Sequence, residues 1–315
     1  MPLPSYPNPL IVIIGPTGVG KSELAIQLAL RIHGEIISAD SRYFYRGMDI
    51  GTAKPSEAEL ALVPHHLINI ANPDERCSLA SFQEQARRII SEIQGRGHLP
   101  LLVGGTGQYV RAVVEGWSPP AQAPDHTLRQ ALESWGHEIG YKALYDRLAI
   151  IDPEAARSID PTNMRRTIRA LEVIFLTGER FSAQRTKDPC PYSVAYIGIN
   201  RPRPELYQRI DQRIDEMMAH GFVDEVQGLL SQGYDPYLPS LSAIGYREIL
   251  WYLKGRVTLP EAVTCIRRST RIYVRRQANW FKPTDPSIHW FDAGQSTLTD
   301  ISDWLERTEA WKPPE

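Results

Sequence analysis

Apolar runs and helix-like patterns alternate along the first part of the chain. An apolar run at residues 10–14 precedes a helical pattern in which Leu24 and Leu28 lie on the same side. The apolar segment GEIISAD follows, and a helical pattern around 81–93 then precedes a third apolar run, LPLLVGGTG. Continuous apolar runs separated by helices are typical of buried parallel strands. The pattern therefore predicts an α/β fold with a doubly wound parallel sheet.

A proline-rich segment interrupts this alternation. EGWSPPAQAPDHT contains three prolines, and the residues from about 126 to 187 beyond it have mainly helical patterns. SVAYIGIN then returns to the sheet, and helices are expected from there to the end. We expect a discontinuous core, 1–116 and 194–315, with a helical insertion at 117–193.

The turn between the first strand and helix matches G-x-x-x-x-G-K-[ST], a phosphate-binding loop. Backbone N–H groups and the helix N-terminus would surround phosphate oxygens, while Lys21 supplies a cation and the Ser22 hydroxyl can complete a Mg²⁺ shell. A chance glycine turn is the alternative, but the strand before and the helix after oppose it. The candidate phosphate ligands are Gly15, Pro16, Thr17, Gly18, Val19, Gly20, Lys21 and Ser22. The fold expected is a P-loop NTPase-like core, and the loop alone does not identify the polyphosphate.

Composition adds limits rather than a function. The 315 residues suffice for two domains, or for one large domain with an insertion, and the 42% hydrophobic content is ordinary for a globular protein. No apolar stretch approaches membrane-spanning length, and the first residues lack signal-peptide features. The three cysteines are far apart, which indicates neither a disulfide framework nor a zinc site. We expect a cytoplasmic protein with no membrane partner.

Charge is distributed unevenly despite a net value of −2. Residues 267–282 contain six basic and no acidic side chains, and residues 165–187 contain six basic against two acidic ones. Such clusters favour contact with a polyanion, although two solvated helix faces would look the same.

Residues after the predicted strands are candidates for chemistry, because ligands bind beyond the carboxyl ends of parallel strands. Asp40 could act as a general base, hold Mg²⁺ through water, or cap a helix. Thr106 lies in the glycine-rich end of LPLLVGGTG, and the strand in this segment has no terminal acid, which disfavours ordinary ATP hydrolysis. The similar string LAIIDP, ending near Asp152, is interpreted as a helix end before proline.

Two further patterns have alternative explanations. Arg209 and Arg213 are spaced to share a helix face, where they could hold a diphosphate or pair with Asp211 and Asp215. The tandem pair at 65–66 has no third metal ligand at sensible spacing, so we interpret both histidines as structural or hydrogen-bonding.

Taken together, seven segments resemble the tRNA dimethylallyltransferases, also called tRNA isopentenyltransferases. They are GPTGVGKS, SADSRYFYRGMDIGTAKP, PHHLINI, LLVGGTGQYVRAVVEG, MRRTIRALEV, SAIGYREI and RRQANWFK. They occur in order from about residue 10 to about 282, and we expect a bacterial-type member without the zinc-finger extension of some eukaryotic members.

The resemblance implies a chemistry. The P-loop would hold the diphosphate of dimethylallyl diphosphate, with Mg²⁺, and the acceptor would be the exocyclic amino group of the adenosine on the 3′ side of the tRNA anticodon. That base would be flipped out of its stack. Lys21, Arg209 and Arg213 would stabilise the leaving diphosphate, Asp40 would take the amine proton, and Thr106 would orient substrate.

The resemblance also implies contacts with the anticodon arm of tRNA. Arg165 stands where the family often has glutamine, so it can either read a base edge or hold a phosphate. The basic run near the C-terminus suits phosphate contacts. The implied tRNA-binding residues are Asp40, Ser41, Arg42, Tyr43, Thr106, Arg129, Arg165, Arg166, Thr167, Ile168, Arg169, Ala243, Ile244, Gly245, Tyr246, Arg247, Glu248, Arg271, Arg275 and Arg276.

Three other functions fit parts of the sequence. An adenylate isopentenyltransferase would not need the long basic C-terminal region, and a small-molecule or nucleotide kinase would be expected to carry the strand-end acid. An RNA-binding module with a vestigial P-loop would not need intact Lys21, Ser22, Asp40 and Thr106. We expect a tRNA-modifying prenyltransferase that acts as a monomer.

Overall fold

The computed structural model describes residues 6–118, 125–184, 186–187 and 189–307. The chain divides into two compact units. Unit 1 comprises Met1–Val114 with Cys190–Glu315, and unit 2 comprises Glu115–Pro189. Unit 2 therefore covers most of the stretch in which a helical insertion is expected.

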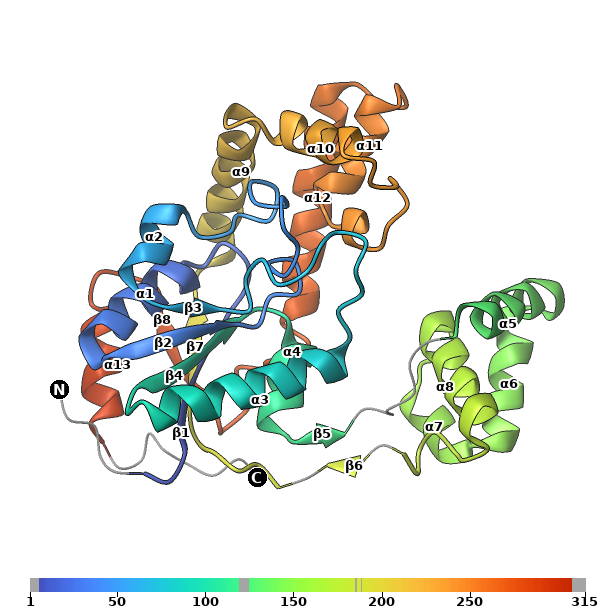
Figure 1. Cartoon of the computed structure of the whole chain (residues 1–315), viewed down its shortest axis with the longest axis horizontal. Helices are drawn as coiled ribbons and strands as arrows, with labels where there is room; N and C mark the ends of the chain where they lie inside the picture. Colours follow the sequence, from blue (N-terminus) through green and yellow to red (C-terminus); the bar gives the residue numbers. More distant parts are fainter. Residues whose placement is uncertain (1–5, 119–124, 185, 188, 308–315) are drawn as a thin grey trace. The chain divides into compact units, whose positions relative to one another are not determined.

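Unit 1 is built on a six-stranded parallel sheet, as the apolar runs predict (Figure 1). The strand order is β3-β2-β4-β1-β7-β8, with β1 near the middle. The strands are β1 (Pro9–Ile14), β2 (Gly34–Ser38), β3 (His65–His66), β4 (Leu99–Gly104), β7 (Ser193–Asn200) and β8 (His289–Asp292).

Alternate residues of β1, β2, β4 and β7 enter two different cores. Ile11 and Ile13 of β1 pack with apolar side chains of α1 (Lys21–Ile32) and α13 (Thr297–Leu305). Val12 and Ile14 pack on the other face with α3 (Leu79–Gly95) and α4 (Gly107–Val114). Burial on both faces explains why these strands are continuous apolar runs.

The region after β7 is not helical throughout, and the expectation of helices to the C-terminus is wrong at β8. Its sequence HWFD is short and its four side chains are half-buried or exposed, so no strand-like alternation marks it. It nevertheless pairs with β7 along Ile197–Asn200.

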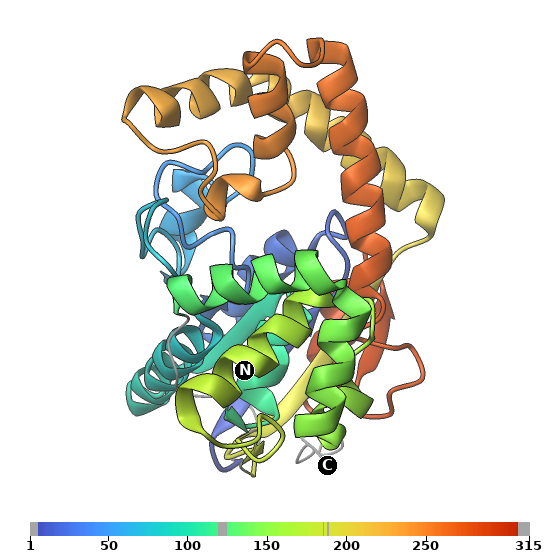
Figure 2. The same cartoon turned by 90° about the vertical axis from the view of Figure 1, so that its right-hand side faces the viewer.

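Helices α9 to α12 form a group beyond the carboxyl ends of the strands (Figure 1). In Figure 2 the long helix α12 rises from the edge of the sheet toward α10 and α11, and it also contacts α9. These elements are α9 (Arg203–Ala219), α10 (Phe222–Ser231), η1 (Ser240–Ser242), α11 (Tyr246–Leu253) and α12 (Leu259–Gln277). The short helix α2 (Glu57–Leu62) begins with a capping box formed by Ser56 and Glu59.

Unit 2 contains a helical bundle and a small antiparallel strand pair that the sequence does not predict. Leu132, Leu144, Leu148 and Leu171 form its core. Asp152 ends one helix and caps the next, accepting the Ala155 N–H at 3.0 Å, which confirms the interpretation of LAIIDP. The elements are α5 (His126–Ile139), α6 (Tyr141–Ile151), α7 (Pro153–Ser158), α8 (Met164–Thr177) and the antiparallel pair β5 (Trp117–Ser118) and β6 (Thr186–Lys187).

Among the described residues, no helix combines the length and the apolar character that crossing a bilayer requires.

Candidate active site

The P-loop joins β1 to α1 and needs glycine at two points of close approach. A Cβ on Gly15 would lie 2.6 Å from the carbonyl oxygen of Ile199 in β7. Gly18 has a φ of +84°, and a Cβ there would lie 3.0 Å from the Ile210 side chain of α9. The loop is therefore packed between the sheet and α9, with its shape set by backbone conformations that other residues rarely adopt.

Lys21 lies among charged groups from two other segments. Its ammonium donates to the carbonyl of Pro16 at 2.9 Å. Burial lowers the pKa of Lys21 to about 8, with the Asp40 carboxylate acting in the opposite direction and the Arg213 guanidinium in the same one. The three residues thus meet at the P-loop, as the sequence predicts.

Asp40 is not a helix cap. Its Oδ1 accepts the backbone N–H of Arg42 at 3.0 Å, and its carbonyl accepts that of Tyr43, in a turn that follows β2. Within the described part of the chain, Oδ2 accepts no protein hydrogen bond. One oxygen therefore holds the turn while the other is left for a ligand or a proton.

Helix α12 contributes two side chains to this centre that the sequence analysis missed. Gln277 is buried; its Oε1 accepts the Thr17 N–H at 2.9 Å, and its Nε2 donates to the Gly105 carbonyl at 3.0 Å. Burial and the Asp40 charge raise the pKa of Tyr273, while hydrogen bonds with the Thr106 and Gln277 side chains lower it. The signal was the i,i+4 spacing of Tyr273 and Gln277 within a run that was interpreted only for its charge.

The structure distinguishes between the two alternative roles of Arg209 and Arg213, diphosphate binding and pairing with the neighbouring aspartates. Arg209 Nε donates to the Gly18 carbonyl at 3.0 Å, and Arg213 Nη2 donates to the Ala53 carbonyl at 3.3 Å. The acidic residues between them face α12 instead, where Asp211 pairs with Arg271, and Asp215 with Arg267. Both arginines are therefore directed toward the P-loop side rather than paired with the neighbouring aspartates.

The expected tRNA-contact residues of unit 1 divide into buried and accessible positions. Arg42 donates to the carbonyls of Pro239 and Ser240, at 3.3 and 3.2 Å, and Arg247 lies over the Trp251 ring. Ser41, Tyr43 and Ile244 are partly exposed, whereas Arg275 and Arg276 are exposed. The side chains of Ala243, Tyr246 and Glu248 are buried, so they would support a surface rather than contact RNA themselves.

In unit 2, Arg165 and Arg166 are exposed at the start of α8. Thr167 and Ile168 are buried. Arg129 and Arg169 both pair with the buried Glu172, at 2.6 and 3.0 Å. The pairing satisfies a buried carboxylate and leaves the first turn of α8 as the more accessible basic surface.

The tandem histidines are hydrogen-bonded, as expected. Nδ1 of His65 contacts the Val63 carbonyl at 2.9 Å, and Nε2 of His66 contacts Glu35 at 2.7 Å. Across the described residues, no group of three or more His, Cys, Asp or Glu side chains is arranged to hold a metal ion.

The fold and this centre define a P-loop α/β protein in which Lys21, Arg209 and Arg213 lie at the P-loop. Comparison with known proteins specifies the family. Residues 43–284 match the IPP transferase family and residues 8–69 the isopentenyl transferase family. The chain is 51% identical to a tRNA dimethylallyltransferase of Roseiflexus sp. over 306 residues, covering 95% of this chain and 99% of the relative. The chain therefore belongs to the tRNA dimethylallyltransferase family.

Solved structures agree with this assignment. The full-length tRNA isopentenylpyrophosphate transferase of Bacillus halodurans is 43% identical, with a TM-score of 0.71 over 95% of both chains. A eukaryotic dimethylallyltransferase acting on tRNA is 27% identical, with a TM-score of 0.77 over 95% of this chain and 76% of the other.

Proposed function

We propose that this protein transfers the dimethylallyl group of dimethylallyl diphosphate to the exocyclic amino nitrogen of the adenosine 3′-adjacent to the anticodon in tRNA. The observation that supports it most directly is the meeting of Lys21, Asp40 and Arg213 at the P-loop. Two cations suit a diphosphate leaving group, and the carboxylate beside them suits removal of a proton from the acceptor.

At the donor, the allylic C–O bond breaks and its electron pair leaves with the diphosphate. Negative charge grows on the leaving oxygen, so groups that are fixed beforehand lower the barrier. Lys21, the loop N–H groups, Arg209 and Arg213 would supply this stabilisation. Loss of the Lys21 contact to Pro16 would free its ammonium for the ligand.

At the acceptor, the adenosine nitrogen bonds to the allylic carbon and must lose a proton. Asp40 Oδ2 would take that proton, because Oδ1 is already engaged with Arg42. Thr106, which immediately precedes α4, would orient the acceptor through its hydroxyl, and Tyr273 would hold that hydroxyl in place.

The residues present fit a magnesium ion beside the diphosphate. Mg²⁺ usually takes one or two protein oxygens together with phosphate oxygens and water. Ser22 is exposed at the start of α1, and its hydroxyl would bind the ion directly. When bound, the ion would neutralise charge on the leaving diphosphate.

The anticodon arm of tRNA would meet the exposed arginines. Arg275 and Arg276 in unit 1, and Arg165 and Arg166 in unit 2, are exposed and suited to phosphate contacts. We propose that the protein acts on tRNA as a monomer, which light scattering of the free protein and of its tRNA complex would test.

Single-turnover transfer from radiolabelled dimethylallyl diphosphate, with Mg²⁺, tests the proposal. One acceptor is a tRNA with adenosine following its anticodon, and the other is adenosine monophosphate. Label in the tRNA alone is the expected result. Label in the free nucleotide would indicate an adenylate isopentenyltransferase, and ATP turnover without label transfer would indicate a kinase or ATPase.

A further inference from the structure

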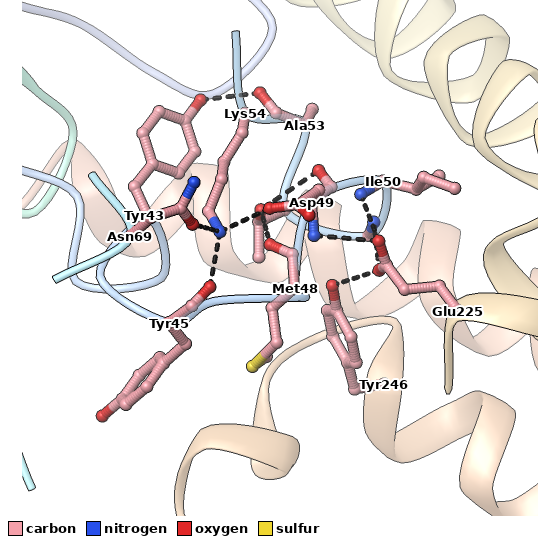
Figure 3. Close-up of polar contacts among 12 residues, drawn as sticks. Tyr43, Tyr45, Met48, Asp49, Ile50, Ala53, Lys54, Asn69, Glu225 and Tyr246 are labelled. Atoms are coloured by element: carbon pink, nitrogen blue, oxygen red, sulfur yellow. Dashed lines mark hydrogen bonds and ion pairs between the residues drawn. The ribbon is translucent and has the colours of Figure 1, made fainter. Parts of the chain in front are cut away.

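The turn at residues 48–54, which follows the segment carrying Asp40 and Tyr43, is attached to α10 by one carboxylate (Figure 3). Glu225 accepts the backbone N–H groups of Asp49, Ile50 and Gly51 at 2.8, 2.6 and 3.1 Å. It also accepts the Tyr246 hydroxyl at 2.5 Å. Three successive amides directed at one carboxylate form a strong, charge-assisted attachment.

Packing reinforces this attachment. A Cβ on Gly51 would lie 2.0 Å from the Phe222 ring, so the backbone of the 48–54 turn lies directly against α10. Met48 is fully buried at the beginning of the turn. Any side chain larger than the hydrogen atom of Gly51 would displace the Phe222 ring. The turn therefore has little freedom to shift.

Lys54 secures the other end of the same turn. Its side chain is only 3% exposed. The ammonium donates to the Tyr45 carbonyl and to the side-chain oxygens of Asp49 and Asn69, at 2.5, 2.6 and 2.6 Å (Figure 3). All three ammonium donors are thus used within the protein, so none is left for a ligand.

The turn presents one carbonyl to the active site. Ala53 has a φ of +53°, a left-handed conformation that a non-glycine residue adopts at a cost of about 1 kcal/mol. Its carbonyl accepts the Tyr43 hydroxyl at 2.8 Å and Arg213 Nη2 at 3.3 Å. Burial and the Asp40 charge raise the pKa of Tyr43 to about 12, while Arg213 and a hydrogen bond with Ser22 act in the opposite direction. Tyr43 and Arg213 therefore share an anchor beside the P-loop.

We propose that Glu225 and Lys54 are positioning residues for the diphosphate: they fix the 48–54 turn so that the Ala53 carbonyl directs Arg213 and Tyr43 toward the P-loop ligand. This inference rests on the proposed function for the identity of the ligand. Neither residue touches the diphosphate, and both act through the turn. Because Tyr246 belongs to the segment expected to support tRNA contacts, the same hydrogen bonds connect the acceptor side of unit 1 to its donor side.

The test measures binding of inorganic pyrophosphate by calorimetry, with Mg²⁺, in Glu225→Gln and Lys54→Met. Each variant removes one charge-assisted attachment of the 48–54 turn, so the turn no longer holds the Arg213 guanidinium in the direction that matches the anion. Pyrophosphate binding should therefore weaken about tenfold. Affinity for tRNA should change by less than about threefold, since phosphate contacts elsewhere dominate it. The matched control is Glu261→Gln, whose carboxylate likewise accepts a backbone N–H, that of Thr258 at 2.7 Å, at the start of α12.

A double-mutant cycle separates positioning from general stabilisation. In an Arg213→Met background, Glu225→Gln should weaken pyrophosphate binding by less than about twofold, because the group that it positions is gone. Equal effects in both backgrounds, or wild-type pyrophosphate affinity in folded Glu225→Gln and Lys54→Met, would overturn the inference. Circular dichroism establishes folding, and Tyr43→Phe, which removes one hydroxyl, provides a milder variant expected to weaken binding in the same direction.

The two proposals can fail independently. If the unmodified protein binds pyrophosphate but transfers no label to tRNA, the proposed function fails while the positioning inference is still tested by binding. If label is transferred and the variants bind pyrophosphate normally, only the inference fails.

Discussion

The Gln277 side chain, at the end of α12, accepts the backbone N–H of Thr17 in the P-loop at 2.9 Å. The same amide donates to the carbonyl of Gly105, one residue before Thr106. A single buried side chain therefore sets the separation between the loop that would hold the diphosphate and the turn that would orient the acceptor. It also ties both to the helix that carries the exposed arginines Arg275 and Arg276.

Gln277→Glu should lower single-turnover transfer by about tenfold or more, because a carboxylate can accept from Thr17 but cannot donate to Gly105. It also brings a negative charge toward the diphosphate. The measurement is the transfer rate at saturating tRNA as the prenyl donor is varied. Gln85→Glu, on the outer helix α3, is the matched control and should transfer normally. A normal rate in Gln277→Glu would contradict the assigned role.

Asp40→Asn should lower the single-turnover rate by about 10²–10⁴-fold, the usual contribution of a general base. The asparagine oxygen can still accept the Arg42 N–H, so the turn after β2 should persist. Filter binding should give a tRNA affinity within a few-fold of the unmodified protein. An unchanged rate would exclude Asp40 as the base.

Pyrophosphate binding should weaken as pH rises through about 8, the value to which burial lowers the pKa of Lys21. Above that pH the free protein loses the Lys21 charge, so binding must first restore a proton. Calorimetric titrations across this range check the profile. Lys21→Arg stays charged and should give a flatter curve, which also corrects for ionisation of the pyrophosphate itself. Identical curves would show that Lys21 is not the titrating group.

Arg275→Ala should weaken binding to cognate and non-cognate tRNA by a similar factor and lower the slope of log affinity against log salt by about one. Arg267→Ala is the comparison, because Arg267 pairs with Asp215 at 2.5 Å. Its effect on the slope should be smaller. A change in preference between the two tRNAs would instead mean that Arg275 reads a base.

Glu35→Gln should lower the free energy of unfolding by about 1–3 kcal/mol at neutral pH. Burial alone would raise the pKa of Glu35, but hydrogen bonds from Arg96, His66 and His98 outweigh it and lower the pKa to about 2. A lowered pKa stabilises the fold above the ordinary value of 4.5, and this contribution is lost as pH falls from there toward 2. Urea unfolding should therefore show the two proteins converging in acid. A constant difference at every pH would rule out the ion cluster as the cause.

Local sequence patterns were sufficient to predict the features that depend on residues close together in the sequence. The apolar runs predicted β1, β2, β4 and β7, and G-x-x-x-x-G-K-S predicted the loop between β1 and α1. The sequence could not show whether the arginines of α9 pair with the neighbouring aspartates or point toward the P-loop. The answer depends on where α12 packs, because Arg271 of α12 pairs with Asp211 and Arg209 then contacts the P-loop. Gln277 was missed for the same reason, since its partners lie far away in sequence.

Unit 2 interrupts the chain between Val114 and Cys190, and β7, which pairs with β1 along its whole length, comes after that interruption. During synthesis from the N-terminus, the strand that bears the P-loop is therefore made long before one of its two neighbours. The contacts within unit 2 are close in sequence, so unit 2 can fold before β7 is available to pair with β1. Until Gln277 emerges, the P-loop lacks the side chain that closes it, so a ribosome stalled earlier should display a nascent chain that binds pyrophosphate poorly.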